Sequence, residues 1–430
     1  VARKAAAESI VLLKNDGALP LAADAKVDVV DQVGVKYMGC GRGSAWGYMP
    51  YCRTIEEGLT AAGYELSHEN RDVAVFTITR NATEGVETEN FNEYYLNDAE
   101  RAKIAELAAQ GYKKIVLVLN VGTMISMEEL KTNPAISAIL YVSYPGMEGG
   151  NAIADVMTGK VNPSGRLPVT VAKTLEDYPS NATWQEARHY VPYEEDIFVG
   201  YRYFSTIPDA NKAVTYPFGY GLSYTEFRLA NASAALDGET VRVSVDVTNV
   251  GKLAGRHSVL AYTGVVGGAA DHPARELRMF AKTKKLAPGE TETLDLSFPV
   301  AQLAYFDDEG ASGSIGSWVV DEGVYTIYLG GAVDEAASVG SITLGASVLS
   351  TPGFKLCSDR LAKRLRSDGS SLTIPVLYGD KNGRRLNSAA NWPKARPDAA
   401  HLIKLQAVAR GEKTLDEFVD QMPLDDLLKL

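Results

Sequence analysis

Cysteine and histidine are scarce in this sequence of 430 residues, which has three cysteines and five histidines. The three cysteines, Cys40, Cys52 and Cys357, form no disulfide framework, and such sparse use favours a reducing compartment and a cytoplasmic location. None of the histidines lies at metal-ligand spacing from a cysteine or another histidine. We therefore expect no metal site, and we expect no cofactor.

Long apolar runs are also missing, because no run approaches the ~20 residues that span a bilayer. Basic residues are outnumbered, with 43 Lys and Arg against 54 Asp and Glu and a net charge of −11. An acidic chain is a poor binder of nucleic acid and of anionic membranes, so we expect neither as a partner. Internal repeats and low-complexity segments are absent too, and the 46% hydrophobic content is typical of a globular protein.

The acidic charge is not evenly spread. Residues 351–410 contain 12 basic and 4 acidic residues, which makes this stretch a basic tail on an acidic chain. Such a tail either binds an acidic partner or packs on the acidic surface of its own chain, and we favour the second interpretation.

The first half of the chain alternates between strand and helix patterns. Asp72–Thr79, Ile115–Leu119 and Ala138–Ser143 are short apolar runs typical of buried strands. Asn97–Gln110 and Gly149–Gly159 are the helices between and after them, and this alternation predicts a mostly parallel α/β sheet. Further elements expected here are a helix over Ala5–Leu13, a strand over Lys26–Val33 and a helix over Thr54–Ala62.

The pattern changes near Tyr224 to short strands separated by turns. Val241–Val247 alternates strictly between apolar and polar residues, and about seven such strands over roughly 120 residues predict a β-sandwich. The last part is an extended tail that ends in a helix over Thr414–Leu430. We therefore divide the chain into an α/β sandwich domain (1–223), a β-sandwich (224–348) and a basic linker with a helical leader (349–430).

Glu84 is the first candidate for chemistry. It lies in a polar loop that directly follows the strand Asp72–Thr79, and ligands of α/β sheets bind outside the carboxyl ends of the strands. A carboxyl group there can act as a general acid if a partly apolar site raises its pKa. The alternative from the residues alone is a solvated loop glutamate.

The second candidate is the glycine-rich segment Gly39–Tyr48. Its G-x-G-x-G spacing is a weak sign of a dinucleotide loop, because no acidic residue follows at the expected distance. Arg42, Ser44 and Trp46 suit a sugar site better, since a flat ring can stack on a pyranose and the polar groups can bond its hydroxyls. A tight turn with one packed aromatic remains equally compatible.

Six further segments carry recognisable motifs. They are Ala5–Asn15, Gly159–Pro168, Ile197–Phe204, Tyr216–Tyr224, Pro273–Leu277 and Leu286–Glu290. Together these segments resemble the glycoside hydrolase family 3 β-glycosidases, and residues 1–345 are similar to the α/β domain and the fibronectin type III-like domain of that family.

The resemblance also implies a domain order. Leu415–Leu430 is similar to the leader of the family's (β/α)8 barrel, which most members place first and which permuted members place after the sandwich. The resemblance thus implies a permuted enzyme whose barrel is missing from this chain. The barrel would then be either a following segment or a second chain. Without that barrel we expect the chain to be inactive.

In this family an Asp of the barrel is the nucleophile and a Glu of the α/β domain is the general acid/base. Thr83-Glu84-Gly85 matches the family's acid/base motif, with Thr in place of the first Gly, while Arg42 and Ser44 fall where the first loop reaches the substrate. The resemblance implies retaining, exo-acting hydrolysis of terminal β-linked sugars, as by a β-glucosidase or β-xylosidase. The alternatives are a non-catalytic carbohydrate-binding or interaction module and a nucleotide-binding protein, and homo-oligomers are possible.

Overall fold

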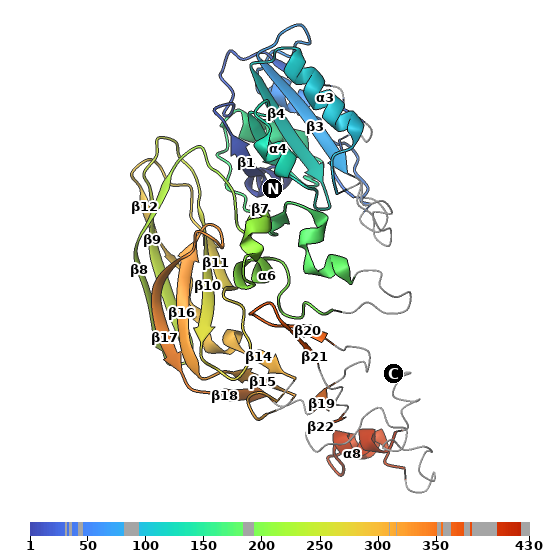
Figure 1. The fold of residues 1–430 in the computed structure, drawn as a ribbon, viewed down its shortest axis with the longest axis vertical. Helices are drawn as coiled ribbons and strands as arrows, with labels where there is room; N and C mark the ends of the chain where they lie inside the picture. Colours follow the sequence, from blue (N-terminus) through green and yellow to red (C-terminus); the bar gives the residue numbers. More distant parts are fainter. Residues whose placement is uncertain are drawn as a thin grey trace.

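The structure is a computed structural model that describes most of the chain. The described residues are 1–30, 32–33, 37–41, 46–80, 94–183, 193–308, 310–314, 316–350, 354–355, 363–373, 379–380 and 402–422. Figure 1 shows an α/β portion at the top and a β-sandwich at the lower left, with α6 (Tyr201–Thr206) between them.

The α/β portion is built around a five-stranded sheet with the order β1-β5-β4-β3-β2. Strands β2 to β5 run parallel, whereas β1 pairs antiparallel with β5. The expectation of a mostly parallel α/β sheet is therefore confirmed. Its elements are α1 (Ala2–Ser9), β1 (Val11–Asn15), β2 (Val27–Val29), α2 (Ile55–Ala61), β3 (Val73–Arg80), α3 (Asp98–Ala109), β4 (Lys114–Val121), α4 (Glu128–Thr132), β5 (Ala138–Tyr141) and α5 (Gly149–Met157).

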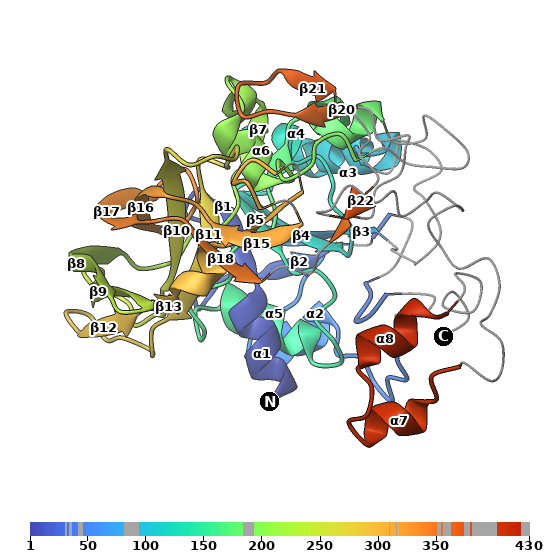
Figure 2. The same cartoon turned by 90° about the horizontal axis from the view of Figure 1, so that it is seen from below.

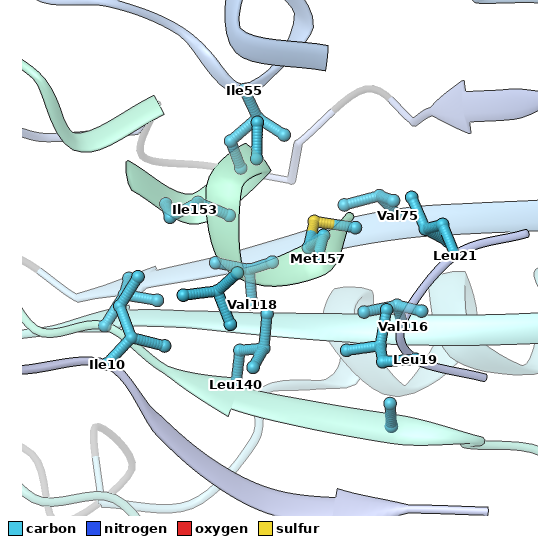
Figure 3. Close-up of a cluster of buried hydrophobic side chains, with 14 of the residues drawn as sticks. Ile10, Leu19, Leu21, Ile55, Val75, Val116, Val118, Leu140, Ile153 and Met157 are labelled. Atoms are coloured by element: carbon cyan, nitrogen blue, oxygen red, sulfur yellow. The ribbon is translucent and has the colours of Figure 1, made fainter. Parts of the chain in front are cut away.

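Helices cover both faces of this sheet because the central strands are apolar on both sides. On β3, Val75 packs with α2 and α5, whereas Phe76 packs in a second cluster with α3. Figure 3 shows the first cluster, in which Ile153 and Met157 of α5 lie over the sheet. Every residue of β3 is buried, as expected for a strand enclosed by two helix layers.

The expected helix over Ala5–Leu13 is wrong in its second half. Helix α1 ends at Ser9, Ile10 is extended, and Val11 begins strand β1. Pairing with β5 determines this outcome, since Leu12 then faces one core cluster while Val11 and Leu13 face the other. A short aliphatic run such as Ile10–Leu13 fits both the period of a helix and the period of a strand, and here pairing with β5 selects the strand.

A connecting segment leads from the α/β portion to the sandwich. Within it β6 pairs antiparallel with β7. Its elements are β6 (Val171–Ala172), η3 (Leu175–Asp177), η4 (Pro179–Ala182), α6, η5 (Ala210–Ala213) and β7 (Val214–Tyr216).

The second portion is the expected β-sandwich. One sheet has the order β11-β10-β16-β17, and it faces a second sheet in which β9 pairs with β8, β12 and β13. Alternate residues of β9, Val241, Val243, Val245 and Val247, are buried between the sheets. The strands are β8 (Phe227–Asp237), β9 (Thr240–Asn249), β10 (Ser258–Val266), β11 (Glu276–Lys282), β12 (Thr291–Asp295), β13 (Phe298–Pro299), β14 (Tyr305–Asp307), β15 (Ser317–Val320), β16 (Gly323–Gly330), β17 (Ala337–Leu344) and β18 (Ser347–Ser350), with η6 (Val300–Leu303) after β13.

The tail contains a hairpin that the sequence patterns did not predict. Strands β20 (Lys363–Leu365) and β21 (Ser371–Thr373) pair antiparallel beside α6, as Figure 2 shows. Arg364 of this hairpin binds Asp196 and Asp308, so here the basic tail packs on the acidic surface of its own chain, as expected. The other described elements of the tail are β19 (Phe354–Lys355), β22 (Gly379–Asp380), α7 (Leu405–Ala409) and α8 (Leu415–Asp420).

Candidate active site

The candidate active site lies at the carboxyl edge of the parallel strands. Strand β3 ends at Arg80, β4 at Val121 and β5 at Tyr141, so the segments after them leave the sheet at one edge. Glu84 follows β3 by four residues in the sequence but lies outside the described residues. The structure does describe other residues of this edge.

Asn120 holds three segments of this edge together. Its side-chain amide donates to the carbonyl oxygens of Met38 (2.9 Å) and Ser143 (2.6 Å) and accepts from the backbone N–H of Met38 (2.7 Å). The hydroxyl of Thr79 also donates to it, at 3.4 Å. Asn120 is fully buried, so these bonds replace water for the main chain of two loops.

The loop after β5 is shaped by close contacts. Ser143 has φ +49°, a left-handed conformation that few non-glycine residues adopt and that often occurs at functional sites. The next residue, Tyr144, donates its hydroxyl to the carbonyl oxygen of Arg80 at 2.6 Å. Its ring lies against Gly122, where an added Cβ would be 2.2 Å from a ring carbon. Glycine is therefore required at this position, after β4.

The glycine-rich segment is tied to the same loop. The N–H of Gly146 donates to the carbonyl oxygen of Gly39 at 2.8 Å, and the N–H of Arg53 donates to that of Met147 at 2.8 Å. Gly39 and Arg53 flank residues 40–52 in the sequence. Both flanks of this stretch are therefore attached to the loop that follows β5.

Exposed aromatic rings belong to this segment. Trp46 is 66% exposed, and Tyr48 and Tyr51 are exposed as well. Tyr51 donates its hydroxyl to Glu148 at 2.9 Å, and the hydrogen bonds from Asn151 and Tyr51 lower the pKa of that carboxyl group. Rings that remain in solvent next to polar loops are suited to stacking on a ligand.

Two cysteines lie in or beside the glycine-rich segment. Burial, with a smaller effect of Cys40, raises the pKa of the Cys52 thiol. Its sulfur packs at the position of Gly39, 3.0 Å from where a Cβ would be. A thiol with a raised pKa is a poor nucleophile, so the local environment gives Cys52 a packing role.

The structure describes only part of the predicted site. Glu84, Arg42 and Ser44 lie outside the described residues, whereas Trp46 is described and exposed. The residues that sequence reasoning missed are Asn120 and Tyr144. Asn120 had a usable signal, because it is the first polar residue after the apolar run Ile115–Leu119.

Among the described residues, no group of three or more His, Cys, Asp or Glu side chains is placed to hold a metal ion. Among the same residues, no helix is both long enough and apolar enough to cross a membrane.

Residues 10–224 match the glycosyl hydrolase family 3 C-terminal domain, and residues 257–333 match a fibronectin type III-like domain. The chain belongs to glycosyl hydrolase family 3. The predicted resemblance and the predicted fold class are thereby confirmed.

Two curated relatives align along nearly the whole chain. Beta-glucosidase A of Butyrivibrio fibrisolvens is 31% identical over 99% of this chain and 64% of its own length. A beta-glucosidase of Ruminococcus albus is 33% identical over 98% of this chain and 49% of its own length. The chain thus spans about half to two thirds of the length of these relatives.

Two solved structures have the same fold. A beta-glucosidase from Paenibacillus barengoltzii superposes with a TM-score of 0.77 at 28% identity, over 98% of this chain and 52% of that one. Beta-glucosidase 3B from Thermotoga neapolitana, solved in complex with glucose, gives a TM-score of 0.72 at 31% identity, over 80% of this chain and 54% of that one.

The segments that resemble family 3 join the two portions of the fold. Arg166 donates to the carbonyl oxygen of Gly221 at 2.7 Å and contacts His257 of the sandwich at 3.2 Å. Asn162 accepts from the hydroxyl of Ser223 (2.8 Å) and the N–H of Tyr224 (3.0 Å). These residues therefore have a structural role at the junction.

Proposed function

We propose that the chain is the non-barrel portion of a retaining, exo-acting β-glycosidase, a β-glucosidase or β-xylosidase, with Glu84 as its general acid/base. The observation that supports this most is the family 3 membership of a chain in which Thr83-Glu84-Gly85 comes shortly after the end of β3 at Arg80 in the sequence. The names of the relatives, which include several beta-glucosidases, support a terminal β-linked sugar as substrate.

The second carboxyl group comes from outside this chain. A (β/α)8 barrel, in a following segment or a second chain, supplies an Asp as nucleophile. This is supported by the relatives that align over nearly all of this chain and still extend well beyond it. The tail with α7 and α8 then leads toward that barrel.

Hydrolysis proceeds in two steps. The barrel Asp attacks the anomeric carbon while Glu84 donates its proton to the glycosidic oxygen, so the C–O bond breaks and the aglycone leaves as an alcohol. Glu84, now a carboxylate, takes a proton from water, which attacks the anomeric carbon and displaces the Asp. Two inversions retain the β configuration, and the two carboxyl groups are ~5–5.5 Å apart.

In this proposal the glycine-rich segment Gly39–Tyr48 binds the sugar. Trp46 stacks on a pyranose face, and Arg42 and Ser44 bond its hydroxyl groups. The exposure of Trp46, Tyr48 and Tyr51 next to the loop after β5 supports this assignment.

The test is Glu84→Gln in the complete enzyme. An amide cannot donate the proton, so kcat/KM should fall about 10²–10⁴-fold with an unactivated alkyl β-glucoside. It should fall far less with a dinitrophenyl β-glucoside, whose leaving group needs no proton. Near-normal activity of Glu84→Gln on the alkyl glucoside would refute the assignment and favour a non-catalytic carbohydrate-binding module.

A further inference from the structure

The residues that flank the segment 81–93 in the sequence are joined by one side chain. Arg80 is the last residue of β3, and its guanidinium Nη2 donates to the carbonyl oxygen of Tyr95 at 3.3 Å. Tyr95 lies just before α3. One side chain thus joins the residue before the segment to the residues after it, and Glu84 lies between these two points in the sequence.

The Arg80 side chain is fixed by a buried ion pair. Its guanidinium donates to both carboxylate oxygens of Glu100, with Nη2 2.7 Å from Oε2. The two side chains are only 10% and 3% exposed. A paired planar fork of this kind fixes direction as well as distance.

Glu100 connects this pair to the start of α3. Its Oε2 accepts from the N–H of Asn97 at 2.9 Å, and the Asn97 side chain accepts from the N–H of Glu100 at 2.9 Å. This capping box makes the first turn of α3 rigid. The end of β3 and the beginning of α3 are therefore held by one carboxylate.

Both ends have further anchors. Before the segment, the carbonyl oxygen of Arg80 accepts from Tyr144 at 2.6 Å. After it, Tyr94 donates to the carbonyl oxygen of Ala172 at 3.0 Å and Tyr95 donates to Glu176 at 3.0 Å. The residue before 81–93 is thus attached to the loop after β5, and the residues after 81–93 are attached to the connecting segment.

A buried ion pair is an expensive way to stabilise a fold, because apolar residues of similar size do so equally well. Here the ion pair fixes how the end of β3 and the start of α3 lie relative to each other. A catalytic group must be held within about 0.5 Å of its productive position, and a misplacement of about 1 Å costs roughly 100-fold in rate.

We propose that Arg80 is a positioning residue, which holds the ends of the segment 81–93 so that Glu84 reaches the glycosidic oxygen. This rests on the proposed function, because it requires Glu84 to be the general acid/base. In this role Arg80 acts through Glu84 and not through a contact of its own with the substrate.

The test uses the complete enzyme with the double variant Arg80→Met/Glu100→Gln. The substitution removes both charges together, so no unpaired charge stays buried, and Gln at position 100 keeps the capping box. Arg101→Met is the matched control, since Arg101 is on α3 next to Glu100 and forms an exposed ion pair with Glu129 at 3.1 Å. Thermal unfolding of each variant identifies any that fail to fold.

We expect kcat/KM of the double variant to fall by about tenfold to 100-fold with an alkyl β-glucoside. With a dinitrophenyl β-glucoside it should stay within about twofold, because that leaving group needs no acid. Arg80→Lys, which keeps the charge without the fork, should lie between wild type and the double variant, and Arg101→Met should match wild type.

Glu84→Gln is measured alongside to separate the two proposals. If it shows no dependence on the leaving group, the proposed function fails. If it does show that dependence while the folded double variant slows both substrates equally or neither, only the positioning role of Arg80 is overturned. A folded double variant that selectively loses the alkyl substrate supports the role.

Discussion

Arg166 Nη2 lies 3.2 Å from Nδ1 of His257, across the junction between the α/β portion and the sandwich. Burial, together with the charge of Arg166, lowers the pKa of His257 to about 3 from its ordinary value of 6.5. Because the guanidinium can only donate, His257 accepts with a neutral ring. The junction therefore depends on an uncharged histidine.

This lowered pKa predicts a pH-dependent stability. Above about pH 6.5 His257 is neutral in the folded and unfolded states, so it contributes no pH dependence there. Between about pH 6.5 and 3 only the unfolded state takes up the proton, so the free energy of unfolding falls by up to about 1.4 kcal/mol per pH unit. Urea unfolding at several pH values, with His257→Gln compared with wild type, measures this slope.

The variant should lose that part of the slope, because glutamine does not titrate and its carbonyl oxygen still accepts from Arg166. Curves of wild type and His257→Gln that stay parallel from pH 7 to pH 4 would contradict the account of the junction.

Removal of the Asn120 amide should destabilise the carboxyl edge. Asn120→Leu keeps the volume but leaves the polar main-chain atoms of Met38 and Ser143 without their partner. We expect a loss of about 2–4 kcal/mol in the free energy of unfolding. The control Asn211→Ala, at an exposed position, should change stability little. Equal stability of the two variants would show that the hydrogen bonds of Asn120 do not stabilise this edge of the sheet.

Docking of the tail hairpin should depend on Arg364. Its guanidinium lies 2.9 Å from Asp196 and 2.6 Å from Asp308, and its side chain is only 11% exposed. Arg364→Ala should raise hydrogen exchange of residues 363–373 and make them more accessible to protease. Lys363→Ala, at an exposed position of the same hairpin, is the control. Unchanged exchange in Arg364→Ala would mean that other contacts hold the hairpin.

Loss of the Trp46 ring should weaken substrate binding without changing the chemical step. In the complete enzyme we expect Trp46→Ala to raise KM about tenfold, equivalent to about 1.4 kcal/mol, with kcat nearly unchanged. Phe280→Ala removes a ring of similar exposure, 68%, from β11 of the sandwich and should leave KM unaltered. A KM of Trp46→Ala equal to wild type would remove Trp46 from the sugar site.

Much of the fold can be predicted from sequence periodicity, because the burial of a strand determines its pattern of apolar residues. The apolar run of β3 is unbroken because both faces of the strand are buried, whereas the residues of β9 alternate because one face is buried. The run Ile10–Leu13 was predicted wrongly, since only its pairing with β5 decides between helix and strand. The hairpin around Arg364 has no apolar period at all, because ion pairs across the fold hold it.

The site was less accessible to such reasoning. Glu84 was selected as a candidate because a polar loop follows a buried strand and because Thr83-Glu84-Gly85 matches the family's motif, and the first of these rules applied to β4 would have selected Asn120. Tyr144 and the Arg80–Glu100 pair had no local signal, because their partners are distant in the sequence. Arg42, Ser44 and Glu84 remain predictions.

The most direct test of the account is the product that Glu84→Ala of the complete enzyme forms from a dinitrophenyl β-glucoside in the presence of azide. Without its base the variant cannot activate water in the second step, whereas azide is already a nucleophile and needs no deprotonation. We predict that azide restores turnover and that the product is the β-glucosyl azide. Turnover that azide does not increase, or an azide product with the α configuration, would contradict the role of Glu84 as the general acid/base of a retaining enzyme.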